Sequence, residues 1–144
     1  MYWKFRAAGG VIASGRLEAF LVGLGVTWVM TGVYIFVDPI GFYEAVPGLQ
    51  LMGPFNMHFI RDIGLAFIAS GGALAWGGFA EARALALAGI AWPSLHALFH
   101  IQIWSHRGFP FDNIFAFDLF AVIGPPAFAL LAVLKLGRSQ DSRR

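Results

Sequence analysis

The sequence from Leu17 to Val37, LEAFLVGLGVTWVMTGVYIFV, contains 21 residues and a single charged side chain, Glu18. A membrane-spanning helix needs about 20 apolar residues to cross roughly 30 Å of hydrocarbon. The run is too long for the apolar part of a secretory signal peptide, and no cleavage site of small residues follows it. We therefore expect a permanent membrane helix here, preceded by a short interfacial segment over residues 1–16.

Three further apolar runs follow in the remaining sequence, at Phe55–Phe79, Ala84–Trp104 and Ile114–Leu136. The connections between them are rich in proline, glycine or charge, as turns are. The chain of 144 residues is 58% hydrophobic and 12% charged, with a mean hydropathy of +0.70. This balance predicts a single all-α domain over residues 1–144, an integral membrane antiparallel four-helix bundle.

Composition also excludes several functional classes. The chain has no cysteine, which rules out disulfides, thiolate metal ligands and cysteine nucleophiles. The net charge is +2, but the basic residues are scattered around the apolar runs and form no patch, so nucleic acid is not an expected partner.

The distribution of basic residues predicts the orientation in the membrane. Eight of the ten flank the same side of the four runs: Lys4, Arg6, Arg16, Arg83, Lys135, Arg138, Arg143 and Arg144. Because basic residues concentrate on the cytoplasmic side, both termini are expected to be cytoplasmic.

Two further patterns concern helix geometry. Small residues four apart, Gly23, Thr27 and Thr31 in the first run and Ala69, Ala73 and Gly77 in the second, are expected to let helices pack closely. Pro93 and the Gly124-Pro125-Pro126 step are expected to bend the third and fourth helices.

Ionisable residues inside the predicted spans are the main indication of function, because they are costly in a bilayer unless they are paired or used. His58 and Asp62 are four residues apart in the second span, and so are His96 and His100 in the third, so each pair shares a helix face. With Asp118 in the fourth span, all of these residues fall in the predicted outer half. We expect them to form one cluster, with Arg61 beside it.

The cluster allows several interpretations. His58, Asp62, His96, His100 and Asp118 are the candidate ligands of an iron, copper or zinc ion, since imidazole and carboxylate suit these metals. A haem between His58 and His96 or His100 is a second possibility. A quinone or another lipid-soluble substrate, with the histidines relaying its protons, is a third. A purely structural polar network explains the same residues.

Other residues complete the candidate site. Arg61 and Asp62 are the candidate catalytic pair, with Arg61 neutralising charge. Tyr34, Trp92 and Trp104 are the candidate cofactor-binding residues. His106 and Arg107 are expected to cap the third helix or to meet lipid headgroups.

The stretch Asn56–Trp76, NMHFIRDIGLAFIASGGALAW, together with WPSLHALFH at Trp92–His100, resembles the small four-span bacterial membrane proteins of the DoxX-like group. The resemblance covers roughly the second and third spans, through Arg61, Asp62 and Gly64 and a late His96 or His100. It implies a four-helix bundle in the bacterial cytoplasmic membrane and, for some members, a subunit role in quinone-linked oxidoreductases. No catalytic residues come with it.

The sequence thus predicts a metal- or quinone-binding subunit of a membrane oxidoreductase system. The alternative is a non-catalytic accessory subunit that packs against a larger membrane complex. Membrane lipids and either such a complex or a homo-oligomer are the expected partners.

Overall fold

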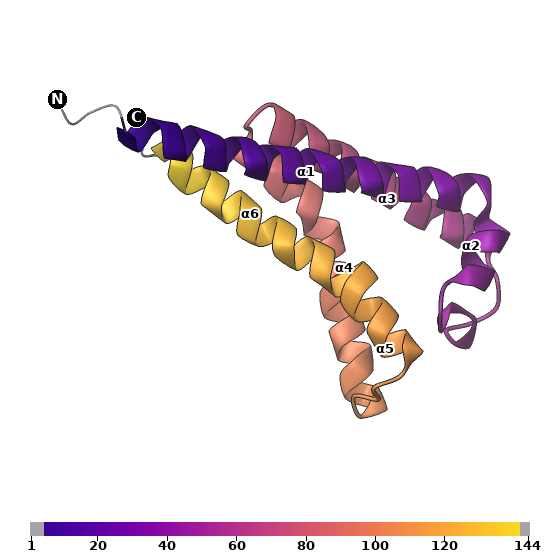
Figure 1. Ribbon diagram of the computed structural model, residues 1–144. Coiled ribbons are helices and arrows are strands. Elements are labelled where there is room, and N and C mark those ends of the chain that lie inside the picture. The colour runs from indigo at the N-terminus through magenta and orange to yellow at the C-terminus, as the bar shows by residue number, and fades with distance from the viewer. Residues whose placement is uncertain (1–4, 142–144) are drawn as a thin grey trace.

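The computed structural model describes residues 5–141, and the surroundings of side chains over residues 15–136 (Figure 1). Throughout the described chain the regular structure is helical. Three long helices, α1 (Phe5–Val37), α3 (Met57–Phe79) and α4 (Arg83–Arg107), are followed by a composite one. That last helix consists of α5 (Asn113–Phe117), a π-helical segment η2 (Asp118–Ile123) and α6 (Gly124–Asp141).

Four segments are long and apolar enough to cross a membrane: Gly15–Val37, Met57–Phe79, Arg83–Arg107 and Asn113–Leu136. The predicted all-helical fold with four such helices is therefore confirmed. Residues 5–16 belong to α1, so over these residues the expected short interfacial segment is not a separate element, and residues 1–4 of that segment lie outside the described residues. Of the basic residues used to predict orientation, Lys4, Arg143 and Arg144 lie outside the described residues.

The connection between α1 and α3 is structured, although it was expected to be a loop. It contains α2 (Pro39–Ala45) and a 3₁₀ turn, η1 (Leu49–Leu51). Asp38 begins α2, because its carboxylate accepts a hydrogen bond of 2.9 Å from the Gly41 N–H. Pro39 follows at the first helical position, where its missing N–H costs nothing.

The main hydrophobic core lies toward the end of the molecule where α1 begins and α6 finishes. We call this the terminal end, and the end that carries α2 and α5 the loop end (Figure 1). All four long helices contribute buried side chains to the core: Leu21, Trp28, Leu74, Ala86, Ile90, Ala129, Ala132, Val133 and Leu136. The core thus fixes the helices together near the terminal end.

Helices α1 and α3 lie side by side along most of their length because glycines remove side chains from their contact (Figure 1). A methyl group at Gly25 would lie 2.6 Å from the carbonyl oxygen of Gly71, and one at Gly32 would lie 2.5 Å from that of Gly64. These glycines are seven residues apart on each helix, a spacing that keeps one face toward a neighbour.

Several of the small residues that were expected at helix contacts lie away from those contacts. Gly23, Thr27 and Ala69 are exposed, and the Thr27 hydroxyl donates to the carbonyl of Gly23 in its own helix. Gly77 does pack closely, against Ala86 of α4. Within one chain, Gly23, Thr27 and Ala69 are therefore not at a close helix contact, because four-residue spacing defines a face without saying which face meets a neighbour.

Helix α4 begins against α3 and then leaves it. Close packing near their shared turn, where Gly89 meets Leu74, continues as far as the rings of Phe67 and Trp92, whose centroids are 5.1 Å apart. Pro93 comes next, and beyond it α4 leads away from α1 and α3 (Figure 1). Because the splayed part of α4 faces α5 and η2, these elements form the surroundings of its histidines.

Replacing Gly25 with alanine should destabilise the protein by about 1–3 kcal/mol, because the new methyl group meets backbone atoms that cannot move aside. Gly23→Ala is the matched control, since nothing lies within 4 Å of its added methyl group and alanine favours helix. Thermal unfolding in detergent measures both variants. Equal unfolding temperatures for the two would refute the close contact between α1 and α3.

Candidate functional site

The π-helical segment η2 results from the two prolines that follow it. Pro125 and Pro126 have no N–H, so the carbonyls of Ala121 and Val122 lose the donors that an α-helix would supply. The chain takes wider turns here, and the N–H of Gly124 bonds to the carbonyl of Leu119. The predicted irregularity at Gly124-Pro125-Pro126 is therefore present. Asp118 begins this segment and is only 3% exposed.

Four ring-bearing residues follow one another at four-residue intervals along α4: Trp92, His96, His100 and Trp104. The rings of Trp92 and His96 are stacked, with centroids 5.1 Å apart and planes inclined by 8°. The rings of His96 and His100 meet edge to face at 4.7 Å. The predicted pairing of His96 and His100 on one face is thus extended by a tryptophan on each side.

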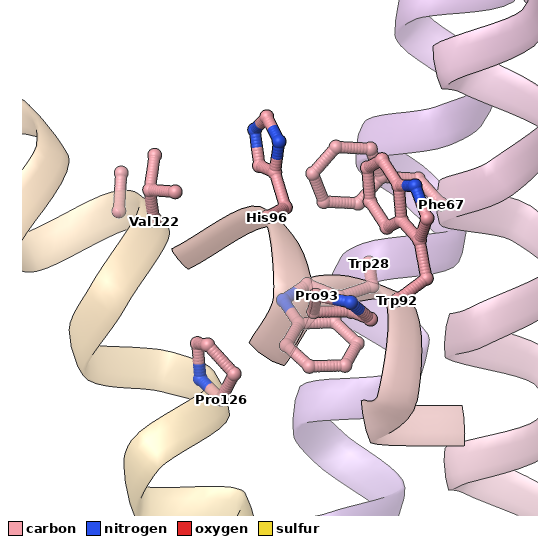
Figure 2. A pocket seen from close by; sticks show the side chains of 8 residues that line it. Trp28, Phe67, Trp92, Pro93, His96, Val122 and Pro126 are labelled. Atoms are coloured by element: carbon pink, nitrogen blue, oxygen red, sulfur yellow. The ribbon is translucent and has the colours of Figure 1, made fainter. Parts of the chain in front are cut away.

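A small cavity lies beside His96 where the four long helices come together (Figure 2). Its volume is about 20 Å³, enough for one water molecule. Its walls come from α1, α3, α4, η2 and α6: Trp28, Phe67, Trp92, Pro93, His96, Ala121, Val122 and Pro126. Two of them, Ala121 and Val122, are the residues whose carbonyls the prolines leave without an α-helical donor.

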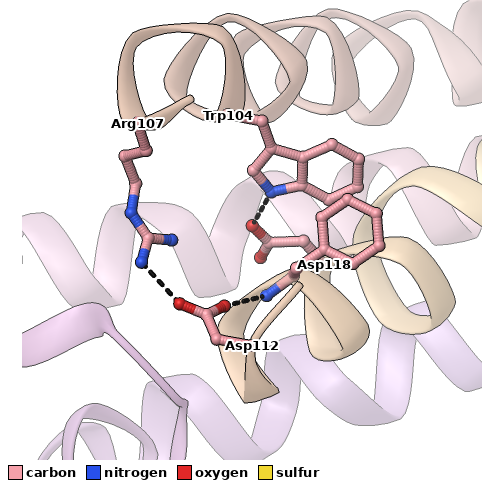
Figure 3. Close-up of polar contacts among 5 residues, drawn as sticks. Trp104, Arg107, Asp112 and Asp118 are labelled. Carbon is pink, nitrogen blue, oxygen red and sulfur yellow. Dashed lines mark hydrogen bonds and ion pairs between the residues drawn. The ribbon is translucent and has the colours of Figure 1, made fainter. Parts of the chain in front are cut away.

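The buried carboxylate of Asp118 links α4 to η2. Its Oδ2 accepts a hydrogen bond of 2.9 Å from the indole Nε1–H of Trp104 (Figure 3). Its Oδ1 lies 2.9 Å from Nδ1 of His100, although the contact is not directed as a hydrogen bond. Asp118 and Trp104 are both buried and His100 is partly buried, so the carboxylate has two polar partners in an apolar environment.

At the loop end, a surface network joins α4 to α5 (Figure 3). Arg107 Nη2 donates to Asp112 Oδ2 at 2.6 Å, and the other carboxylate oxygen of Asp112 accepts from the Phe115 N–H at 2.8 Å. His106 Nδ1 lies 2.9 Å from the Gln102 carbonyl, as expected for a cap of α4. Arg107 instead bridges to the next helix.

The second-span residues lie apart from the histidines of α4. His58 Nε2 is 3.5 Å from Asp62 Oδ2, and their side chains are 90% and 55% exposed. Arg61 points to α1, where its Nε donates to the Phe36 carbonyl at 3.3 Å and its guanidinium lies over the Phe36 ring. Arg61 therefore caps the end of α1, and neither of these contacts involves Asp62.

The single predicted cluster is thus two groups in the structure. His96, His100 and Asp118 come together with Trp92 and Trp104, whereas His58 and Asp62 contact each other on an exposed face of α3. Tyr34 is exposed and touches the ring edge of Phe42. Within the described residues, no group of three or more metal-ligating side chains converges in one chain.

Sequence reasoning missed four residues of the cavity and one role. The missed lining residues lie on other helices than His96 at no diagnostic spacing: Trp28, Phe67, Ala121 and Val122. Trp104 was a candidate cofactor-binding residue, and in the structure its indole holds the Asp118 carboxylate. Its position four residues after His100 was the available signal, since that spacing continues the face of the histidines.

Comparison with known proteins adds no assignment: no protein family, no curated protein and no solved structure matches the chain. The resemblance to the DoxX-like group therefore stays a prediction.

Trp104→Phe should destabilise the protein by about 1–3 kcal/mol, because it keeps the ring but leaves the buried Asp118 carboxylate without its indole donor. Trp76→Phe is the control, since Trp76 is 62% exposed and its loss should change stability by less than about 0.5 kcal/mol. Chemical or thermal unfolding in detergent distinguishes them. A Trp104→Phe variant as stable as the control would contradict the role of this hydrogen bond.

The stability that the loop-end network contributes should fall at acid pH. The Phe115 N–H, and next the Arg107 guanidinium, hold the pKa of Asp112 below its usual value. The carboxylate therefore stabilises the fold above its unfolded pKa of about 3.9, and this contribution is lost as the pH falls through the lowered folded pKa.

Unfolding temperatures measured from neutral pH down to about pH 3 test this dependence. Asp112→Asn should reduce the loss of stability in acid, and Arg107→Ala should reduce it less, since the Phe115 N–H is the larger cause. Identical acid profiles for wild type and Asp112→Asn would show that Asp112 is not the group responsible.

Proposed function

We propose that this protein is a membrane subunit of a bacterial oxidoreductase system, in which His96, His100 and Asp118 relay protons for a lipid-soluble carrier of the quinone class. In this proposal the four long helices form an antiparallel bundle in the cytoplasmic membrane with both termini in the cytoplasm. The loop end then faces outward, and the relay lies in the outer half of the bundle.

The observation that carries the proposal is the unbroken series of contacts from His96 to Asp118. The imidazoles of His96 and His100 are in ring contact, and His100 Nδ1 lies 2.9 Å from the Asp118 carboxylate. Imidazole accepts and releases protons near neutral pH, and a carboxylate beside it stabilises the protonated form. Oxidation of a quinol releases two electrons and two protons, so a pathway that carries protons away is what its binding site requires.

The dimensions of the site limit how each cofactor class fits. The cavity of about 20 Å³ beside His96 is far smaller than a pocket for a haem or a quinone ring, which takes about 300 Å³ or more. The residues therefore do not fit a haem enclosed between the helices. A quinone head group fits only against His96 from the lipid-facing side, with the cavity beneath it open to one water.

Each residue of the relay has its own role in this proposal. His96 is the first proton acceptor, and the ring of Trp92 stacked on it restricts its orientation. His100 passes the proton toward the loop end. Asp118 receives the proton from His100, whose Nδ1 lies 2.9 Å from its Oδ1, and Trp104 positions the carboxylate through its hydrogen bond. Electrons are exchanged with a partner protein of the same system.

The accessory-subunit alternative is favoured by a different observation. Large apolar side chains are exposed around the fourth span, among them Phe120 at 78% and Phe128 at 65%. Lipid or the helices of a larger complex would cover them. This alternative assigns the contacts of Asp118 to helix packing and predicts no response of the histidines to a quinone.

Infrared difference spectra of the detergent-solubilised protein, recorded while a short-tailed benzoquinol is oxidised at an electrode, test the proposal. We expect imidazole and carboxylic acid bands as the relay takes up the two protons, with the carboxylic acid band lost in Asp118→Asn and the imidazole band lost in His96→Ala. His106→Ala is the control, since His106 contacts only the Gln102 carbonyl at the exposed loop end. Spectra identical to those of the quinone in empty micelles would overturn the proposal.

A further inference from the structure

Helix α3 has one face that no part of the described chain covers. The exposed residues on it follow one another at alternating intervals of four and three: His58, Asp62, Leu65, Ala69, Gly72 and Trp76. At 100° per residue they lie within about 80° of one another, opposite the glycines that contact α1. We call these six residues the α3 stripe. Its spacing is that of a helix seam that packs against another helix.

The composition of the α3 stripe differs from that of a lipid-facing surface. Ala69 and Gly72 leave its middle flat, and nothing lies within 4 Å of where a side chain at Gly72 would be. In membranes, small residues let a second helix approach closely. At one end, an imidazole and a carboxylate stand near the start of a helix that is apolar enough to span the membrane, and their only partner among the described residues is each other.

The geometry of the His58–Asp62 pair indicates which further ligand it can bind. His58 Nε2 and Asp62 Oδ2 are 3.5 Å apart, and their side chains are 90% and 55% exposed. Two ligand atoms bound to one tetrahedral zinc ion at about 2.0–2.2 Å are about 3.4 Å apart. The pair is therefore spaced as one edge of a zinc coordination sphere, with two positions still to be filled.

A second copy of the chain supplies what is missing. Copies inserted in the same orientation are related by a two-fold axis along the membrane normal, so the two α3 helices run in the same direction and their His58 residues lie at the same depth. Two such pairs present two neutral imidazoles and two carboxylates. Their charge of −2 balances a divalent cation, so the assembled site is neutral.

We propose that the α3 stripe joins two copies of this protein and that His58 and Asp62 of both copies together bind one divalent cation of the zinc type. One chain holds only half of the site, which agrees with the finding that no group of three metal-ligating residues converges within the described chain. Arg61 does not oppose the cation, because its guanidinium is turned toward Phe36 of α1. The inference is independent of the proton relay, which uses none of these residues.

Native mass spectrometry and light scattering of the full chain in detergent, with and without Zn²⁺, test the proposal. We expect zinc to shift monomer to dimer with one ion per two chains, and a chelator to reverse the shift. His58→Ala should abolish the effect. His106→Ala should not, because His106 lies outside the α3 stripe.

A second variant separates the surface from the metal ligands. Gly72→Leu keeps His58 and Asp62 but fills the flat part of the α3 stripe, so it should prevent the zinc-dependent dimer while helicity stays that of wild type. The proposal is overturned if zinc binds one ion per monomer or does not bind. It is also overturned if the dimer persists in chelator or in His58→Ala, or if Gly72→Leu dimerises as wild type does.

Discussion

Two missing amide hydrogens determine the arrangement around Asp118. Pro125 and Pro126 are adjacent, so two successive carbonyls one turn earlier lose their donors in the middle of an apolar helix. The wider turns of η2 are the response, and they add about one residue to the helical path. One residue corresponds to a rotation of roughly 100°, which in a regular helix would move Asp118 away from Trp104 and His100. The buried carboxylate and its two partners therefore depend on this irregularity.

A second constraint acts on the other half of the molecule. The glycines of α1 and α3 hold two backbones so close that these helices have little freedom to rotate or separate. α4, by contrast, bends away after Pro93 and makes its later contacts with η2 and α5. The protein thus combines a tightly packed helix pair with a splayed one, and the histidines of α4 lie on the splayed part. Polar side chains are accommodated there because η2 supplies the Asp118 carboxylate, which pairs with Trp104 and lies beside His100.

The number and approximate length of the long helices could be predicted from the sequence, since length and apolar composition are local properties. The rotation of each helix about its own axis could not be predicted from the sequence. The spacing of His58 and Asp62 places both on one face, but that face is exposed, and the glycines at 64, 71 and 78 were the signal. They lie about 120–160° from His58 around the helix, which is where the neighbouring backbone packs. The spacing of His96 and His100 was sufficient because Trp92 and Trp104 extend the same face toward η2.

The segment that contains α2 also could not be predicted from average composition. Three prolines and three glycines between residues 38 and 54 indicated a loop, yet Asp38 and Pro39 together start a helix. Asp38 followed by Pro39 is a signal for the start of a helix, but the high content of proline and glycine favoured the prediction of a loop. Local side-chain to backbone bonds of this kind decide short elements, whereas average composition decides only the long ones.

The size of the cavity beside His96 has a consequence for ion selectivity. A space of about 20 Å³ admits one water molecule, and its walls are mostly aromatic and aliphatic. A sodium or potassium ion would have to shed nearly all of its hydration shell to enter, with few oxygen atoms to replace it. A proton can instead pass to His96 along a hydrogen bond from such a water molecule, so no hydrated ion has to enter. The same packing that makes the space beside His96 too small for a cofactor therefore makes it too small for a hydrated metal ion as well.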